Sequence, residues 1–152
     1  GERTPIHDPH AKGMIFGLDL THERADIYRG ALEGIAYGVN AVVETYLEAK
    51  APLQRIVAVG GGTNNPVWSQ AISDVSGWQQ DVCEKTMGAA YGNAFLAAVA
   101  IGDAGRGDIA RWNPVARHIA PNAENAPVYA KRYETFKQLY SRTKDLMPHA
   151  AD

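Results

Sequence analysis

Several features typical of other protein classes are missing from this 152-residue sequence. It has no block of Lys and Arg and a formal net charge of −2, which argues against a general surface for nucleic acid or anionic membranes. It has no signal peptide and no apolar run long enough to span a bilayer, so we expect no membrane partner. Its single cysteine, Cys83, cannot form an internal disulfide. We therefore expect a reducing compartment, most simply the cytoplasm.

The composition is that of an ordinary globular domain. Hydrophobic residues make up 45% of the chain and charged residues 21%, which is enough to build one core. The first 13 residues are rich in Pro, Gly and charge and do not begin with Met. We expect this opening to be a loop within a longer protein.

The most informative stretch is residues 55–74. An apolar, β-branched run at residues 56–59 predicts a buried strand; Gly60, Gly61 and Gly62 follow it, and then a helical pattern begins. Such a turn lets backbone approach a ligand closely, and the helix behind it offers unpaired N–H groups, an arrangement that suits a nucleotide. The alternative is that the glycines only permit a sharp strand-to-helix turn.

Two common Gly-rich motifs are absent from this stretch. A dinucleotide fingerprint needs a third glycine where Asn65 stands, and the Gly-Lys-Ser/Thr of a Walker A loop occurs nowhere in the chain. Asn64 or Asn65, next to Pro66, fits a helix N-cap followed by proline at the first helical position. One asparagine would then cap the helix, and the other would remain free to bind.

Apolar spacing predicts an α/β pattern for the whole chain. Thr21 is expected to cap a long helix that runs to about Glu48, and its stripe of Gly30, Gly34 and Gly38 predicts that another backbone packs closely against it. We expect strands at residues 56–59 and 79–83, helices at 67–75, 88–101 and 127–147, and a turn-rich connection at 103–126. Two adjacent parallel strands are too few for an independent sheet, so the sheet is expected to be incomplete.

At this point the sequence resembles the C-terminal part of the FGGY carbohydrate kinases, especially their xylulokinase-like branch. One matching stretch comprises residues 13–18 and, after a spacer, 26–33; it departs from the family pattern at Gly30, where Ala or Ser is usual. The second comprises residues 59–70, followed by Ser73 and Asp74, and is similar to the family's adenine-nucleotide loop. Residues 88–94 resemble the family's late Gly-Ala-Ala helix.

The resemblance implies a ribonuclease H-like domain of the actin/hexokinase ATPase type, of which residues 1–152 would be a C-terminal, nucleotide-binding portion. It implies a parent enzyme that uses ATP and Mg²⁺ to phosphorylate a sugar hydroxyl, with xylulose as the leading substrate. By the same resemblance, Gly61 and Asn65 contact adenosine, while Gly60 and Gly62 shape the loop. The sugar-binding domain, the catalytic Asp and the magnesium motif would lie outside this chain, so the chain alone is expected to be inactive.

Two other classes of function remain open. An incomplete sheet has an exposed strand edge, which is typical of a non-catalytic association module and allows a homodimer. A Gly-rich strand–turn–helix also occurs in dinucleotide oxidoreductases. The missing third glycine counts against that class.

Overall fold

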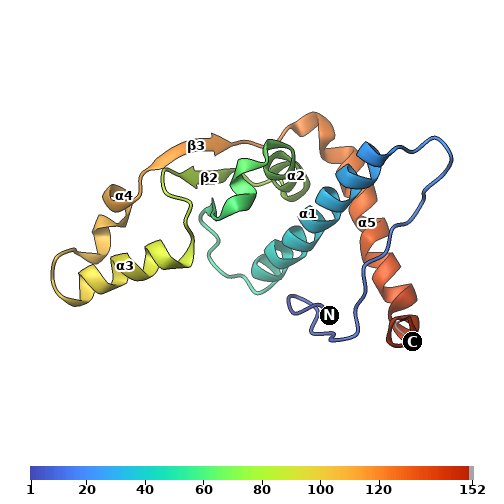
Figure 1. The fold of residues 1–152 in the computed structure, drawn as a ribbon, viewed down its shortest axis with the longest axis horizontal. Coiled ribbons are helices and arrows are strands. Elements are labelled where there is room, and N and C mark those ends of the chain that lie inside the picture. Colours follow the sequence, from blue (N-terminus) through green and yellow to red (C-terminus); the bar gives the residue numbers. More distant parts are fainter. Residues whose placement is uncertain (151–152) are drawn as a thin grey trace.

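The computed structural model describes residues 1–150 and contains a three-stranded sheet with helices. A parallel strand–helix–strand unit lies at its centre, as the sequence predicts, and helices precede and follow this unit (Figure 1). Short 3₁₀ turns connect several elements. In chain order the helices and strands are α1 (Arg24–Glu48), β1 (Ile56–Ala58), α2 (Pro66–Ser76), β2 (Gln80–Cys83), α3 (Ala89–Ala100), α4 (Ile109–Trp112), β3 (Val115–Ile119) and α5 (Ala126–Thr143).

The sheet has the order β1-β2-β3. Strands β1 and β2 are parallel, with Ile56 opposite Gln80, and α2 connects them. Strand β3 is antiparallel to β2, with Ile119 opposite Gln80. This third strand lies within the connection predicted at residues 103–126, so that part of the prediction is wrong. Only Ile119 of its five residues is buried, and the sequence therefore lacks the alternation that marks a half-buried strand.

Helix α1 ends at Glu48 as predicted but begins later than the Thr21 cap requires. Its N-cap is Glu23, whose backbone N–H donates to the carboxylate of Asp26 at 2.8 Å. The Thr21 hydroxyl instead donates to Asp19 at 2.6 Å. The capping contact therefore comes from Asp26, within the first turn of the helix, and not from Thr21.

The glycine stripe of α1 is not covered by another backbone in the part of the chain that the structure describes. A Cβ added to Gly30, Gly34 or Gly38 would meet no atom within 4 Å outside the helix's own backbone. The prediction of close backbone packing is therefore wrong for residues 1–150.

The main core forms where α1, α2 and α5 meet. Tyr37 of α1 packs with Tyr129 and Tyr133 of α5, and Phe136 lies against the same cluster. Figure 1 shows these three helices at one end of the molecule and α3 with α4 at the other. No helix within residues 1–150 is both long and apolar enough to cross a membrane.

Candidate functional site

The turn between β1 and α2 has a backbone that requires glycine at its first position. Gly60 has φ 85° and ψ −178°, a combination that is accessible essentially only to glycine. Its N–H donates to the carbonyl of Thr86 at 2.7 Å, which joins the turn to the segment that leads into α3. The chain then makes a 3₁₀ turn over Gly61–Asn64 before α2 begins.

The other two glycines have different surroundings. A Cβ at Gly62 would lie 3.0 Å from Cε3 of Trp68 and closer still to Cζ3, so the indole ring occupies the space of a side chain. Gly61 is exposed, its φ lies outside the left-handed region, and an added Cβ would meet nothing within 4 Å among the described residues. The fold thus needs Gly60 for its conformation and Gly62 for packing, whereas Gly61 is open on its outer side.

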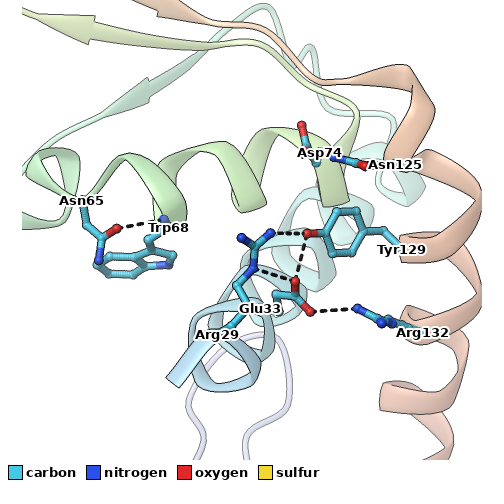
Figure 2. A network of polar contacts seen from close by, with 8 residues as sticks. All are labelled: Arg29, Glu33, Asn65, Trp68, Asp74, Asn125, Tyr129 and Arg132. Carbon is cyan, nitrogen blue, oxygen red and sulfur yellow. Dashed lines mark hydrogen bonds and ion pairs between the residues drawn. The ribbon is translucent and has the colours of Figure 1, made fainter. Parts of the chain in front are cut away.

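Asn65 is the N-cap of α2, which confirms one of the two predicted cap positions. Its Oδ1 accepts the backbone N–H of Trp68 at 3.1 Å, and Pro66 follows at the first helical position (Figure 2). Its Nδ2 donates to the hydroxyl of Tyr28 at 3.1 Å. The capping role therefore falls on the same asparagine that the resemblance assigns to nucleotide contact. The four predicted site residues, Gly60, Gly61, Gly62 and Asn65, share this turn, and their contact with a ligand stays a prediction.

Two further residues support the turn and were missed by sequence reasoning. Arg117 of β3 donates from its guanidinium to the carbonyl of Thr63, and the Thr63 hydroxyl donates to the carbonyl of Gly60 at 2.8 Å. Tyr28, from the first half of α1, bonds Asn65 as described above. Arg117 lies on the strand that was predicted to be part of a turn-rich connection. No local pattern marks either contact, because the partners are far apart in sequence.

The buried carboxylate of Glu33 joins α1 to α5. Glu33 is 9% exposed and accepts from Arg29 Nε at 2.8 Å, from the Tyr129 hydroxyl at 3.0 Å and from Arg132 at 3.2 Å (Figure 2). The hydrogen bond to Tyr129, and then that to Glu33, raises the pKa of the Arg29 guanidinium. Burial raises the pKa of Tyr129. These contacts fix the helix that carries Tyr28.

A second buried carboxylate, Asp74, holds the other end of α2. Its Oδ1 accepts from Gln70 at 2.7 Å and from the backbone N–H of Asn122 at 2.8 Å, and its Oδ2 accepts from Asn125 at 2.8 Å. All three donors are neutral, so hydrogen bonds alone satisfy the carboxylate. Asp74 thereby fixes the connection from β3 to α5 against the helix that begins at the candidate turn.

The chemistry available at the turn is that of binding. It offers open backbone at Gly61 and the amide nitrogen of Asn65, whereas in the first turn of α2 Pro66 has no N–H and the N–H of Trp68 is taken by Asn65. Such groups recognise oxygen and ring-nitrogen acceptors. Within residues 1–150, no group of three or more His, Cys, Asp or Glu side chains is arranged to hold a metal ion.

Comparisons with known proteins agree with this architecture. Residues 1–101 match the FGGY family of carbohydrate kinases, C-terminal domain. Xylulose kinase of Bacillus subtilis is 31% identical over 148 residues, which cover 96% of this chain and 30% of that protein. Gluconokinase of the same species is 30% identical, with 97% and 27% covered. The crystal structure of xylulose kinase from Rhodospirillum rubrum superposes with a TM-score of 0.81 at 31% identity and covers 93% of this chain and 29% of that one.

These similarities confirm the predicted fold class. The structure is the C-terminal portion of a ribonuclease H-like, actin/hexokinase-type domain, and its sheet is incomplete. The chain spans about 30% of the length of the curated relatives that it matches. With its Gly-rich turn, its strand–helix–strand unit and the match over residues 1–101, the chain belongs to the FGGY family of carbohydrate kinases.

Proposed function

We propose that this chain is the adenine-nucleotide-binding part of an ATP-dependent sugar kinase. The observation that carries the proposal is the unequal role of the three glycines. Gly60 and Gly62 are needed by the fold, whereas Gly61 is exposed and has open space where a side chain would stand. A glycine that the fold does not need, placed beside a helix N-terminus, fits a backbone that a ligand approaches closely.

In this proposal residues 1–152 are a portion of the C-terminal domain, and a separate N-terminal domain binds the sugar. The parent enzyme transfers the terminal phosphoryl group of ATP to a hydroxyl of a ketopentose, with xylulose as the leading substrate. Two xylulose kinases among the relatives, those of Bacillus subtilis and Escherichia coli, support this choice. The cytoplasm is the expected compartment, and this remains a prediction.

The residues of the β1–α2 turn fit ATP better than they fit Mg²⁺. The open backbone at Gly61 and the amide of Asn65 suit a nucleoside, whereas no cluster of carboxylates within residues 1–150 suits a metal ion. When bound, Mg²⁺ neutralises charge on the transferred phosphoryl group. We expect its ligands to be phosphate oxygens and residues outside this chain. This chain then contributes binding and orientation of the nucleoside, and no catalytic residue.

Calorimetric titration of the purified chain with Mg-ADP and with NAD tests the proposal. We expect weak binding of ADP, no binding of NAD, and a loss of about tenfold in ADP affinity for Asn65→Ala, since a polar contact contributes about 1–2 kcal/mol. Asn64→Ala is the matched control, because Asn64 is the exposed neighbour. Circular dichroism of each variant establishes that it is folded.

Two results of this titration would contradict the proposal. A folded chain that binds neither nucleotide would contradict the proposal and favour a non-catalytic association module. Binding of NAD would favour a dinucleotide enzyme. A coupled assay with ATP and xylulose addresses the separate prediction that the chain alone is inactive, and measurable phosphorylation by the pure chain would contradict it.

A further inference from the structure

Strand β3 carries a β-bulge beside Arg117. Arg117 lies opposite Val82 of β2. The next residue of β2, Cys83, lies opposite Val115, so Ala116 has no partner of its own on β2. A bulge of this kind bends its strand and redirects a neighbouring side chain, and bulges are frequent beside functional sites. The backbone of β3 is therefore irregular next to the residue that contacts the Gly-rich turn.

The side chain of Arg117 lies on the face of the sheet that α2 covers. Residues two apart on a strand share a face, and so do residues that lie opposite each other on antiparallel strands. Ile119, two residues after Arg117, lies opposite Gln80, whose amide donates to the carbonyl of Ser69 in α2 at 2.7 Å. The guanidinium of Arg117 donates to the carbonyl of Thr63. Because β2 lies between β3 and β1, this contact connects β3 to the turn that follows the strand beyond its neighbour.

The positive charge of Arg117 is directed at a neutral carbonyl. Arg29 and Arg132 each pair with a buried carboxylate, whereas no ion pair among residues 1–150 includes Arg117. Thr63 is 4% exposed, and its N–H and hydroxyl both donate to the carbonyl of Gly60, at 3.2 Å and 2.8 Å. Hydrogen bonds with a charged donor are stronger than those between neutral groups. The guanidinium thus fixes from outside a turn that Thr63 closes from within.

We propose that Arg117 is a positioning residue of the Gly-rich turn. Its guanidinium holds the turn in the form that receives the nucleotide, and without it the turn opens while the rest of the fold stays intact. This inference rests on the proposed function and adds to the site a residue that lies outside the turn and α2. The side chain of Arg117 is exposed, so its replacement creates no buried cavity and its effect is confined to the turn.

Amide hydrogen exchange followed by NMR measures the order of the turn without any ligand. The N–H groups of Thr63 and Asn65 donate to the carbonyls of Gly60 and Gly62, so their exchange rates report opening of the turn. In Arg117→Met we expect both amides to exchange about tenfold faster, which corresponds to the loss of one hydrogen bond. Exchange at the amides that pair β2 with β3, and the urea midpoint, should not change.

Calorimetry with Mg-ADP and with adenosine tests the consequence for binding. Arg117→Met should weaken both ligands by the same factor, about tenfold, because both need the ordered turn. A direct contact between the guanidinium and the phosphates would weaken ADP alone. Arg111→Met is the matched control, since it removes an exposed arginine from α4, and it should behave as the wild-type chain does in both measurements.

The inference is overturned if exchange at Thr63 and Asn65 is unchanged in Arg117→Met. It is also overturned if exchange rises equally between β2 and β3, which would show a merely structural role in that strand, or if the affinity for ADP alone is lost. A folded wild-type chain that binds neither ligand would contradict the proposed function, and with it the part of this inference that concerns the nucleotide. The exchange measurement needs no ligand and in that case still decides whether Arg117 orders the turn.

Discussion

Gly61 and Gly62 have different surroundings, so replacing each of them with alanine should affect stability differently. Gly62→Ala places a Cβ against the Trp68 ring and should lower the free energy of unfolding by about 1–3 kcal/mol, the usual cost of overpacking. Gly61→Ala meets open space and should change stability by no more than about 0.5 kcal/mol. Urea unfolding followed by circular dichroism measures both. Equal losses for the two variants would contradict the distinction between packing and open glycine.

Three tyrosines between α1 and α5 predict how stability changes at high pH. Burial raises the pKa of Tyr37 to about 12, and burial also raises the pKa of Tyr129 and of Tyr133. An unfolded tyrosine titrates near 10, so the folded state retains these protons at higher pH than the unfolded state does. The resulting stabilisation is present in full below pH 10 and is lost as the pH rises toward 12.

We expect the free energy of unfolding to fall between pH 10 and 12, with Tyr37 alone contributing about 2–3 kcal/mol. Urea unfolding at a series of pH values measures the fall, and absorbance at the tyrosinate band follows ionisation. Tyr37→Phe is the control and should show a shallower dependence on pH. Its stability at neutral pH should be equal or higher, because the Tyr37 hydroxyl is buried with no hydrogen-bond partner among the described residues.

At the scale of elements, Glu33 makes polar contacts that help to hold α1 against α5. Glu33→Gln removes the charge from a side chain that is 11% exposed and leaves Arg29 and Arg132 without their anion. Both arginines are about half exposed, so solvent screens part of the loss. We expect a loss of about 1–2 kcal/mol in the free energy of unfolding.

Glu134→Gln is the matched control, since the pair of Glu134 with Lys137 is exposed on both sides. Its effect should be within about 0.5 kcal/mol. Urea unfolding compares the two variants directly. A similar small effect for both would mean that Glu33 does not hold the two helices together.

The elements also show which parts of the fold a sequence pattern can predict. Strands β1 and β2 and helices α2, α3 and α5 follow from apolar runs bounded by Gly and Pro, which are local signals. Strand β3 has one buried residue in five, and its place is set by pairing with β2, which lies more than 30 residues earlier. Local pattern carries no information about such pairing.

The candidate site likewise contains some contacts that a local sequence pattern predicts and others that it does not. The turn and the helix cap can be predicted because Gly60 and Asn65 act through their own backbone or that of near neighbours. The contacts of Arg117 and Tyr28 join residues 54 and 37 positions apart, and they depend on how β3 and α1 pack. The glycine stripe on α1 failed as a packing signal within residues 1–150, because spacing alone does not say whether another backbone lies against the helix.

At the scale of the whole molecule, large apolar side chains remain exposed around α3 and α4. Met87 is 72% exposed, Leu96 64% and Ile101 74%. Helix α3, which includes Leu96, lies with α4 at the end of the molecule opposite the α1–α2–α5 core (Figure 1). Helices α3 and α4 line an open, mostly apolar hollow there. Exposed apolar surface of this kind favours association. Strand β1 is an edge strand, because among the described residues it pairs only with β2. An exposed strand edge is a second feature that favours association.

We therefore predict that the purified chain associates as its concentration rises. Leu96→Lys introduces a charge into the apolar surface around α3 and should shift the equilibrium toward monomer, because burying an unpaired ammonium group is unfavourable. Ser141→Lys, on the exposed side of α5, adds the same charge elsewhere and should leave association unchanged. Sedimentation velocity over a wide range of concentration distinguishes the cases. A monomer at every concentration would contradict the prediction, and association that Leu96→Lys does not weaken would exclude the apolar surface around α3 as the contact.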